Sequence, residues 1–363
     1  MASDQDIVIV GAGIAGLATS LGLHRLGIQS LVLESADSLR TTGFAFVMWT
    51  NAWRAIDALG LGEILRSKHN QLTGIVTTSV DSGITTAELP FSAIDSQGDH
   101  DIRCMNRRLL LETLESELPK GTVRYSSKVV HIEKAGYFNF VHLADGTTLK
   151  TKPALAGRSA VRAVVHYEDG HGFEPKLMQF FGNGIRYGII PCDDQTLYWF
   201  FTFSPSADPV SDKIKEVVEN TQFNNMVLSQ LRFRYPWELL WRNISQDNIC
   251  VAGDALHPMT PDLGQGGCAA LEDSIVLARV LAEALKEKSS EENEHRRICE
   301  GVEKFAKERR WRGFELISTA YIVGFLQQSN GIVLNFFRDK LAKFLGGLLL
   351  KKASFDCGKL NVK

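Results

Sequence analysis

The sequence predicts an α/β protein with a parallel sheet at its start, a mostly antiparallel sheet in its middle and a helical C-terminal part. Three observations support this prediction. A β-rich apolar run at residues 6–10 leads into glycines and a helical pattern, strand-like runs joined by short turns occupy residues 72–89 and 178–203, and amphipathic helical patterns occupy residues 300–349. A strand, helix and strand in succession are typical of a parallel α/β unit, whereas successive strands with short turns are typical of antiparallel sheets.

Length and composition exclude several classes of protein. The 363 residues are enough for two domains, and 44% hydrophobic with 23% charged residues excludes a disordered chain. The net charge of −2 provides no basic surface, so we expect no nucleic-acid partner. The 6 cysteines show neither a C-x-x-C motif nor a paired spacing. We therefore expect no metal site and no disulfide framework, and a reduced intracellular chain is the default.

The sequence shows no membrane or targeting segment. The apolar run at 344–350 is far shorter than the roughly 18 residues that a membrane span needs. No cleavable signal precedes the first strand, so we expect a cytoplasmic protein, with a chloroplast location open if the N-terminus is incomplete. The charged run at 286–297 is interpreted as a solvated helix end or loop.

A G-x-G-x-x-G motif follows the first predicted strand. Asp6–Val10 is apolar on both faces, which suits a buried parallel strand. Gly11 permits a tight turn, Gly13 lets backbone N–H groups approach a pyrophosphate, and Gly16 allows the helix to pack closely on the strand. The motif comprises Gly11, Ala12, Gly13, Ile14, Ala15 and Gly16.

An acidic residue ends the second predicted strand. Gln29–Leu33 reads as this strand, and Glu34 follows it about 20 residues beyond the glycines. A carboxylate at this place accepts hydrogen bonds from an adenosine ribose. The arrangement predicts a dinucleotide site. The motif alone leaves NAD and FAD both open, and a plain glycine-rich turn is the alternative.

A second glycine-rich stretch lies near residue 260. Asn248–Ala252 reads as another buried strand, and residues 253–268 run through a glycine-rich loop into a long amphipathic helix. A second set of N–H groups at a helix start would face an anion or an electron-rich group, and Asp254 could hold a polyol. A structural corner between strand and helix is the alternative.

This stretch, GDALHPMTPDLGQGG, resembles the GD-x-x-H-x-x-x-P-x-x-G-Q-G motif of the FAD-dependent aromatic-hydroxylase-type monooxygenases, the para-hydroxybenzoate hydroxylase superfamily. Within that superfamily the chain most resembles plant FAD-dependent monooxygenases related to zeaxanthin epoxidase, through residues 38–65, 104–119, 181–203 and 356–360. The resemblance implies an α/β fold with a Rossmann-like parallel-sheet FAD domain, a mostly antiparallel substrate-domain sheet and a helical C-terminus. The implied ranges are 1–70, 99–152 and 245–290 for the FAD domain, 71–98 and 153–244 for the substrate domain, and 291–363 for the C-terminal helices.

The resemblance also implies roles for individual residues. Glu34 would bind the ribose, Arg40 and Arg107 would lie near the pyrophosphate and ribityl chain, and Asp254 would hold the ribityl hydroxyls. N–H groups at the helix start would face the flavin N1–C2=O edge, where a helix N-terminus stabilises negative charge. The full implied cofactor-binding set is Gly11–Gly16, Glu34, Ser35, Arg40, Arg107, Gly253, Asp254, Pro261 (lining the flavin ring), Gly264, Gln265, Gly266 and Gly267.

For Arg107 and His257, purely structural roles are the alternatives to a functional one. Arg107 is favoured over Arg108 for the cofactor because it follows Asn106 in the motif, and one of the two arginines is expected to be a surface charge. His257 is a lone histidine, for which packing beside the cofactor is favoured over catalysis. No side chain is nominated as a general base, because the flavin carries the chemistry.

The activity implied by the resemblance is that of an FAD-dependent monooxygenase. NAD(P)H would reduce the flavin, O2 would give a C4a-hydroperoxide, and one oxygen atom would pass to an apolar or aromatic small molecule. An aromatic-rich middle segment supports that substrate class, although alternation lets only about half of these side chains face a pocket and strand packing is the alternative for each. The aromatic residues are Tyr187, Tyr198, Trp199, Phe200 and Phe201.

One family motif is missing. The resembling proteins carry Asp-Gly followed closely by Ser after an apolar strand, whereas here Asp145-Gly146 reads as a hairpin turn and Asp169-Gly170 as a charged loop. Lys152 runs straight into a segment that resembles the one beyond the motif. We expect one strand and the start of its helix to be absent, on the order of 20 residues. In the family's fold that strand lies beside the first one, and Pro153 makes substitution by the following residues unlikely because it cannot donate to a ladder.

The missing motif keeps two alternatives open. The chain could be a catalytically impaired flavin-binding paralogue or splice product, or an FAD-dependent oxidase or reductase that inserts no oxygen. Small organic substrate and O2 are the expected partners.

Overall fold

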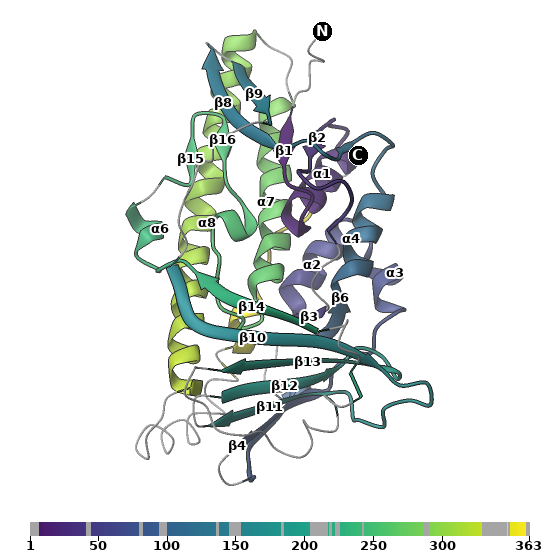
Figure 1. The fold of residues 1–363 in the computed structure, drawn as a ribbon. Coiled ribbons are helices and arrows are strands. Elements are labelled where there is room, and N and C mark those ends of the chain that lie inside the picture. Colours follow the sequence, from purple (N-terminus) through teal and green to yellow (C-terminus); the bar gives the residue numbers. More distant parts are fainter. Residues whose placement is uncertain are drawn as a thin grey trace.

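The computed structural model shows a short parallel sheet and its helices above a larger, mostly antiparallel sheet (Figure 1). The long C-terminal helix runs along the side of both. The predicted α/β fold class is confirmed. The structure describes residues 7–40, 45–79, 83–93, 100–135, 138–144, 154–182, 185–203, 217, 220–221, 226–241, 243–286, 290–328, 347 and 349–360.

The parallel sheet has the strand order β1-β2-β7, with β1 at Val8–Val10, β2 at Leu31–Leu33 and β7 at Val123–Arg124. Helix α1 (Ile14–Arg25) connects β1 to β2 and packs against α7 (Gly266–Leu285). The helices approach closely at Gly22, where an added Cβ would lie only 2.9 Å from the Cβ of Ala278. A glycine at this crossing therefore brings the first glycine motif next to the helix that follows the second.

The large sheet has the order β14-β10-β13-β12-β11-β4-β5. Its pairs are antiparallel except for the parallel pair of β11 with β4. The strands are β4 (Gly74–Ser79), β5 (Thr85–Pro90), β10 (Ala154–His166), β11 (Lys176–Gly182), β12 (Ile185–Pro191), β13 (Thr196–Phe203) and β14 (Met226–Phe233). The predicted hairpins at 72–89 and 178–190 and the strand at 197–203 are present with these bounds.

The remaining elements surround the two sheets. Helix α8 covers Glu291–Gln328 as a single helix and packs on α7. The others are β3 (Ala45–Met48), α2 (Thr50–Ala58), α3 (Gly62–Arg66), η1 (Phe91–Ala93), β6 (Arg103–Asn106), α4 (Arg107–Ser116), β8 (Val129–Ala135), β9 (Phe138–Leu143), α6 (Glu238–Trp241), β15 (Ser245–Gln246), β16 (Ile249–Cys250) and η3 (Gly253–Ala255). No helix in these described ranges is long and apolar enough to cross a membrane.

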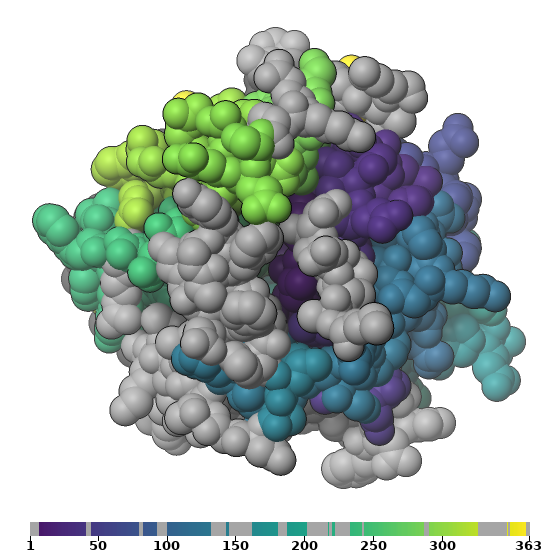
Figure 2. All heavy atoms as spheres, turned by 90° about the horizontal axis from the view of Figure 1, so that it is seen from above, coloured from purple at the N-terminus to yellow at the C-terminus, as the bar shows by residue number. Residues whose placement is uncertain are grey.

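Two strands predicted to be buried on both faces are exposed on one face. In β1 the side chains of Val8 and Val10 are 37% and 57% exposed. Ile249 in β16 is 38% exposed, and Val251, just after β16, is 36% exposed. Within the described residues β1 pairs with β2 alone, and β16 pairs with β15 in an antiparallel sheet of their own. No described strand pairs with the far edge of β1. Seen from above, dark purple atoms of the N-terminal segment are visible at the surface (Figure 2).

The segment after the missing motif does not replace that neighbour. β10 begins at Ala154 and pairs with β13 and β14 in the large sheet, with an irregular register between Leu155 and Ser159. The predicted turn at Asp145-Gly146 and the junction at Lys152-Pro153 lie outside the described residues. The edge of β1 thus matches the position at which the sequence predicts a strand to be absent.

Candidate active site

The first glycine loop leaves open space in front of a helix N-terminus. Gly11 has a φ of +102°, which favours glycine, and Gly13 is the N-cap of α1 without a capping side chain. A Cβ added at Gly11 or Gly13 would meet no described atom within 4 Å, whereas one at Gly16 would lie 2.0 Å from the carbonyl oxygen of Gly11. Gly16 therefore holds the loop against the helix, and the other two glycines leave room for a phosphate near the free N–H groups.

Glu34 lies at the centre of a hydrogen-bond cluster beside this loop. Its Oε2 accepts the backbone N–H of Ala12 at 2.9 Å, and its Oε1 accepts the N–H of Ala36 at 2.9 Å and Nη2 of Arg40 at 2.8 Å. Ser35 also donates to Oε1, at 3.2 Å. Burial by itself raises the pKa of Glu34, but the hydrogen bonds from Ala36, Ala12 and Arg40 outweigh it and lower that pKa to about 2. The residue is therefore an ionised acceptor at neutral pH.

The two adjacent arginines differ in environment. Nη1 of Arg107, the first residue of α4, donates to the carbonyl of Arg40 at 3.0 Å. Burial lowers the pKa of Arg107, and the charge of Asp254 acts in the opposite direction. Arg108 instead forms an exposed pair with Glu112 at 2.6 Å. Arg107 thus faces the same region as Asp254, which is exposed, whereas Arg108 faces solvent.

The two glycine-rich turns contact each other. Gly253 has a φ of +59°, and a Cβ added there would lie 2.9 Å from the Cβ of Ala15. The hydroxyl of Ser274 in α7 donates to the carbonyl of Ala15 at 3.1 Å. Motifs separated by more than two hundred residues therefore form one continuous surface of backbone turns, with Asp254 at its rim.

The start of α7 is an uncapped helix N-terminus with buried polar atoms close by. Its N-cap is Gln265, which gives no side-chain capping bond, and Gly264 has a φ of +63°. A Cβ added at Gly264 would lie 3.2 Å from Nε1 of Trp49. That Nε1 and Nε2 of Gln265 are buried without a hydrogen-bond partner in the described structure. Unused donors at the positive end of a helix favour an electron-rich group.

A fully buried ionic cluster lies behind this N-terminus. Glu272 and Asp273 of α7 face Arg309 of α8, with Nη2 of Arg309 at 2.6 Å from Oε2 of Glu272 and Nε at 2.6 Å from Oδ1 of Asp273. Arg312 adds a 2.7 Å contact to Oε1 of Glu272. The side chains of Arg309, Glu272 and Asp273 are all 0% exposed. Buried charges of this kind are stable only because each one has a partner of opposite charge.

This cluster also holds both glycine-rich turns of the second motif. Oδ2 of Asp273 accepts the N–H of Gly253 at 2.7 Å and lies 2.8 Å from Nε2 of His257, which therefore carries the proton. Nδ2 of Asn51 donates to Oε1 of Glu272 at 2.6 Å and to Oε1 of Gln265 at 2.9 Å, which links the cluster to the start of α7. Burial raises the pKa of Asp273, but His257, Arg309 and the bond from Gly253 outweigh it and lower that pKa to about 2.

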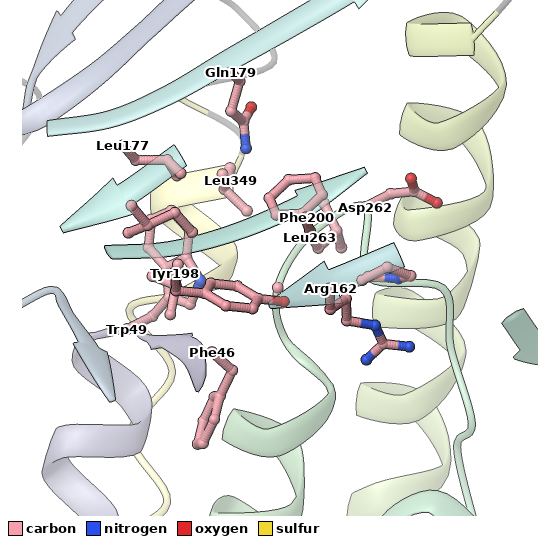
Figure 3. A pocket seen from close by; sticks show the side chains of 14 residues that line it. Phe46, Trp49, Arg162, Leu177, Gln179, Tyr198, Phe200, Asp262, Leu263 and Leu349 are labelled. Atoms are coloured by element: carbon pink, nitrogen blue, oxygen red, sulfur yellow. The ribbon is translucent and has the colours of Figure 1, made fainter. Parts of the chain in front are cut away.

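A pocket opens between the start of α7 and the large sheet (Figure 3). Its open space, part of which is continuous with solvent, amounts to about 590 Å³. Most of its lining is apolar, and Arg162 and Gln179 bring polar groups to it from β10 and β11. The lining residues are Phe46, Val47, Trp49, Arg162, Leu177, Gln179, Ile190, Tyr198, Phe200, Pro261, Asp262, Leu263, Gly264 and Leu349.

Successive side chains of β13 point to opposite faces of the large sheet, so only some of the predicted aromatic residues face the pocket. Tyr198 and Phe200 line the pocket, whereas Trp199 is buried in a separate apolar cluster against which Phe201 packs. Tyr187 belongs to that second cluster, where it stacks on Phe180 with ring centroids 4.3 Å apart. Two of the five predicted aromatic residues therefore line the pocket, in line with the expectation that about half can do so.

The sequence reasoning missed several residues of this region. Arg162 is a charged residue within the otherwise small or apolar run Ser159–Val165, and Glu272-Asp273 is an acidic pair inside an apolar helix. Both patterns are signals, because buried charges are rare without a partner or a function. The site residues proposed from sequence are brought together at Gly11–Gly16, Glu34, Arg40, Arg107 and Gly253–Asp254, while Pro261 and Gly264 border the pocket.

The geometry fits a long dinucleotide better than a single charged group. One end has open glycine turns and the ionised Glu34, the middle has Arg107 and Asp254, and the other end has the uncapped start of α7 beside a mostly apolar pocket. No group of three or more His, Cys, Asp and Glu side chains in the described residues could hold a metal ion.

Two family models match the chain. The model described as "FAD binding domain" matches residues 144–295, which include the second glycine-rich motif. The model described as "Lycopene cyclase protein" matches residues 6–188, beginning at the first strand and its glycine motif.

Curated relatives match over nearly the whole chain. "Monooxygenase 2" of Arabidopsis thaliana is 49% identical, with 98% of each chain covered. "Monooxygenase 1" of the same plant is 34% identical, with 98% of this chain and 99% of the relative covered. Among solved structures, Klebsiella pneumoniae HpxO complexed with FAD and uric acid has a TM-score of 0.80 at 18% identity, with 97% of each chain covered.

The alignment lengths show that this chain lacks residues that the relatives have. The match to Monooxygenase 2 extends over 401 positions and that to Monooxygenase 1 over 404, whereas this chain has 363 residues. Subtracting 363 from 401 leaves at least 38 positions of the first relative without a counterpart here. This difference is at least as large as the segment predicted to be missing.

Proposed function

The chain belongs to the FAD-dependent aromatic-hydroxylase-type monooxygenases, and from this membership we propose that it uses NAD(P)H and O2 to insert one oxygen atom into an apolar or aromatic small molecule. Its cofactor is FAD. When bound, FAD supplies the electron transfer and oxygen activation, so the protein's task is to bind, orient and exclude water.

The assignment of residues to FAD follows the geometry from one end of the site to the other. Gly11–Gly16 would receive the pyrophosphate, and Glu34 would receive the adenosine ribose, since its Oε2 has Ala12 as its one donor in the described structure. Arg107 and Asp254 would flank the ribityl chain. The N–H groups at the start of α7 would face the flavin ring.

The observation that carries the proposal is the position of the pocket. Pro261 and Gly264, which precede α7, form part of its wall, and side chains of the large sheet form the opposite wall. A flavin ring held at the start of α7 would therefore border the same cavity as a substrate held against β13. Proximity of the two reactants in a mostly apolar cavity is what an oxygen transfer requires.

The polar groups of the pocket narrow the substrate class. Arg162 pairs in register with Phe200 across β10 and β13, so a guanidinium lies next to an aromatic ring on one face. Gly188 makes room for that ring, because a Cβ there would lie 2.6 Å from Cε1 of Phe200. We infer a planar aromatic substrate that carries a hydrogen-bond acceptor, such as a carboxylate, phenolate or carbonyl oxygen, for Arg162 to bind.

A second candidate function rests on the open edge of β1. The exposed Val8 and Val10 and the missing alignment positions favour a flavin-binding paralogue or splice product with impaired catalysis. A strand with about five buried apolar side chains, at roughly 1.5–3 kcal/mol each, contributes on the order of 10 kcal/mol. Stability of a whole domain is only about 5–15 kcal/mol, so this loss is comparable to it.

One set of measurements separates these functions from an FAD-dependent oxidase or reductase. The purified protein is loaded with FAD, and NADH or NADPH oxidation is followed with and without a panel of neutral and carboxylate-bearing aromatics. Product one oxygen atom heavier supports the monooxygenase, and peroxide without such product supports the oxidase. Bound flavin with no NAD(P)H oxidation supports the impaired paralogue, and absence of flavin binding contradicts all three.

A further inference from the structure

Two buried cysteines from distant parts of the chain lie in contact. Sγ of Cys104 in β6 is 3.1 Å from Sγ of Cys192, the residue that follows β12. The side chains are 0% and 2% exposed, and both sulfurs are free thiols in this structure. Neither residue lines the pocket or belongs to the cofactor site described above.

The pair lies where the large sheet joins the rest of the molecule. Here the chain passes from α3 to β4, and the N–H of Asn70 donates to the carbonyl of Cys192 at 3.1 Å. The N–H of Leu72 donates to the carbonyl of Ile102 at 2.8 Å, and Gln71 forms a β-bridge with Arg103. The thiol contact therefore spans a joint that is otherwise held by backbone hydrogen bonds of neighbouring residues.

We propose that Cys104 and Cys192 form a reversible disulfide that ties β6 to the end of β12. An S–S bond is about 2.05 Å long, so the two sulfurs need to approach by about 1 Å. A side-chain rotation can supply a movement of this size, since the two sulfurs are already in contact. The two cysteines lie far apart in the sequence, and their spacing gave no sign of pairing, but both belong to the same hydrophobic core.

The reaction balances with hydrogen peroxide as the oxidant. One sulfur, as thiolate, attacks a peroxide oxygen and becomes a sulfenic acid, with water as the product. The second sulfur then attacks the sulfenic sulfur, forms the S–S bond and releases a second water. Two thiols lose two protons and two electrons, and these reduce one peroxide to two waters.

Burial sets the rate of this reaction. It raises the pKa of the Cys104 thiol well above its usual value, and the neighbouring Cys192 raises it further. The thiolate is therefore scarce while the joint is closed, so oxidation requires local opening and becomes faster as pH rises. Once one sulfur is oxidised, the adjacent thiol captures it before further oxidation.

The test uses the full-length protein with hydrogen peroxide. The sample is treated with peroxide, quenched, unfolded, alkylated, digested and analysed by mass spectrometry, with and without dithiothreitol at the end. We expect a linked peptide pair containing Cys104 and Cys192 that dithiothreitol separates. The oxidised protein should also melt about 5 °C higher, because the bond closes a long loop.

Matched variants distinguish pairing from nonspecific oxidation. In Cys104→Ser the remaining Cys192 should proceed to sulfinic acid, while Cys299→Ser, which removes a partly exposed thiol elsewhere, should leave the link unchanged. The proposal is overturned if both thiols of the parent stay alkylatable under peroxide exposure that oxidises Cys299, or if either pairs with another cysteine. The disulfide map of the parent protein, obtained by mass spectrometry, decides between these outcomes even if Cys104→Ser does not fold.

Discussion

Oδ2 of Asp273, in the middle of α7, accepts the backbone N–H of Gly253 at 2.7 Å, so a buried carboxylate holds the turn that presents Asp254. The same carboxylate is neutralised by Arg309 of α8 at 2.6 Å. The C-terminal helix is therefore part of the support of the cofactor site, although it contributes no residue to the pocket within the described ranges. This relationship predicts the effect of breaking the cluster.

Asp273→Asn should destabilise the protein by about 3–5 kcal/mol, because it leaves the buried guanidinium of Arg309 with one carboxylate fewer. Urea unfolding followed by circular dichroism measures this change. The control is Lys304→Ala, which removes an exposed pair with Glu283 and should cost under about 1 kcal/mol. Equal effects of the two substitutions would contradict the role of the cluster.

Gly13→Ala should weaken FAD binding at least about tenfold, which corresponds to roughly 1.4 kcal/mol, without destabilising the FAD-free protein. An added Cβ at Gly13 meets no described atom within 4 Å, so the expected clash is with the pyrophosphate. Titration of the FAD-free protein with FAD measures the affinity. Gly16→Ala is the opposite control: its Cβ would lie 2.0 Å from the carbonyl oxygen of Gly11, so the fold itself should be destabilised.

Acid should remove the stabilising contribution of Glu34. Its pKa is lowered to about 2, so this contribution is fully present above the ordinary carboxyl pKa and is lost as pH falls through about 2. Glu34→Gln should therefore destabilise strongly at pH 7, with the difference in Tm from the parent shrinking between about pH 5 and about pH 2. Glu112→Gln, in an exposed helical pair, serves as the control. A constant Tm difference for Glu34→Gln across this range would show that its ionisation is not the cause.

Arg162→Met should reduce the affinity for carboxylate-bearing aromatics about tenfold or more, since it removes the guanidinium from the pocket. Neutral aromatics of the same size should change less than about threefold, because methionine keeps most of the apolar volume. Perturbation of the absorption spectrum of bound flavin on titration with each ligand gives both affinities. Equal losses for charged and neutral ligands would indicate a distorted pocket rather than a lost charge interaction.

The open edge of β1 predicts that truncating an exposed side chain of this strand costs little stability. Val10→Ala should cost under about 1 kcal/mol because the side chain is 57% exposed, whereas Val32→Ala in β2, which is 0% exposed, should cost about 2 kcal/mol or more. Inserting the relative's extra segment after Lys152 should raise Tm and flavin content and make Val10→Ala as costly as Val32→Ala. An unchanged cost of Val10→Ala, with flavin content unchanged as well, would show that no strand belongs at this edge.

Local sequence patterns were sufficient for much of the fold. The glycine motif with its flanking apolar runs predicts β1, α1 and β2, and the turn signals predict the hairpin of β11 and β12. These features depend on backbone conformation and side-chain alternation, which are properties of a few consecutive residues. The same patterns were wrong about the burial of Val8 and Val10, because burial requires a neighbour that no local pattern provides.

By itself, the sequence determined the α/β class, the two glycine-rich turns and the ionisable groups beside them. Tertiary structure alone decided that Gly253 meets Ala15, that Arg162 reaches the pocket and that Cys104 touches Cys192. The physical reason is that conformational preference is local, whereas contacts between distant segments arise from packing of whole helices and sheets. A residue's chemistry can be read from its type, but its partners depend on which surfaces the folded chain brings together.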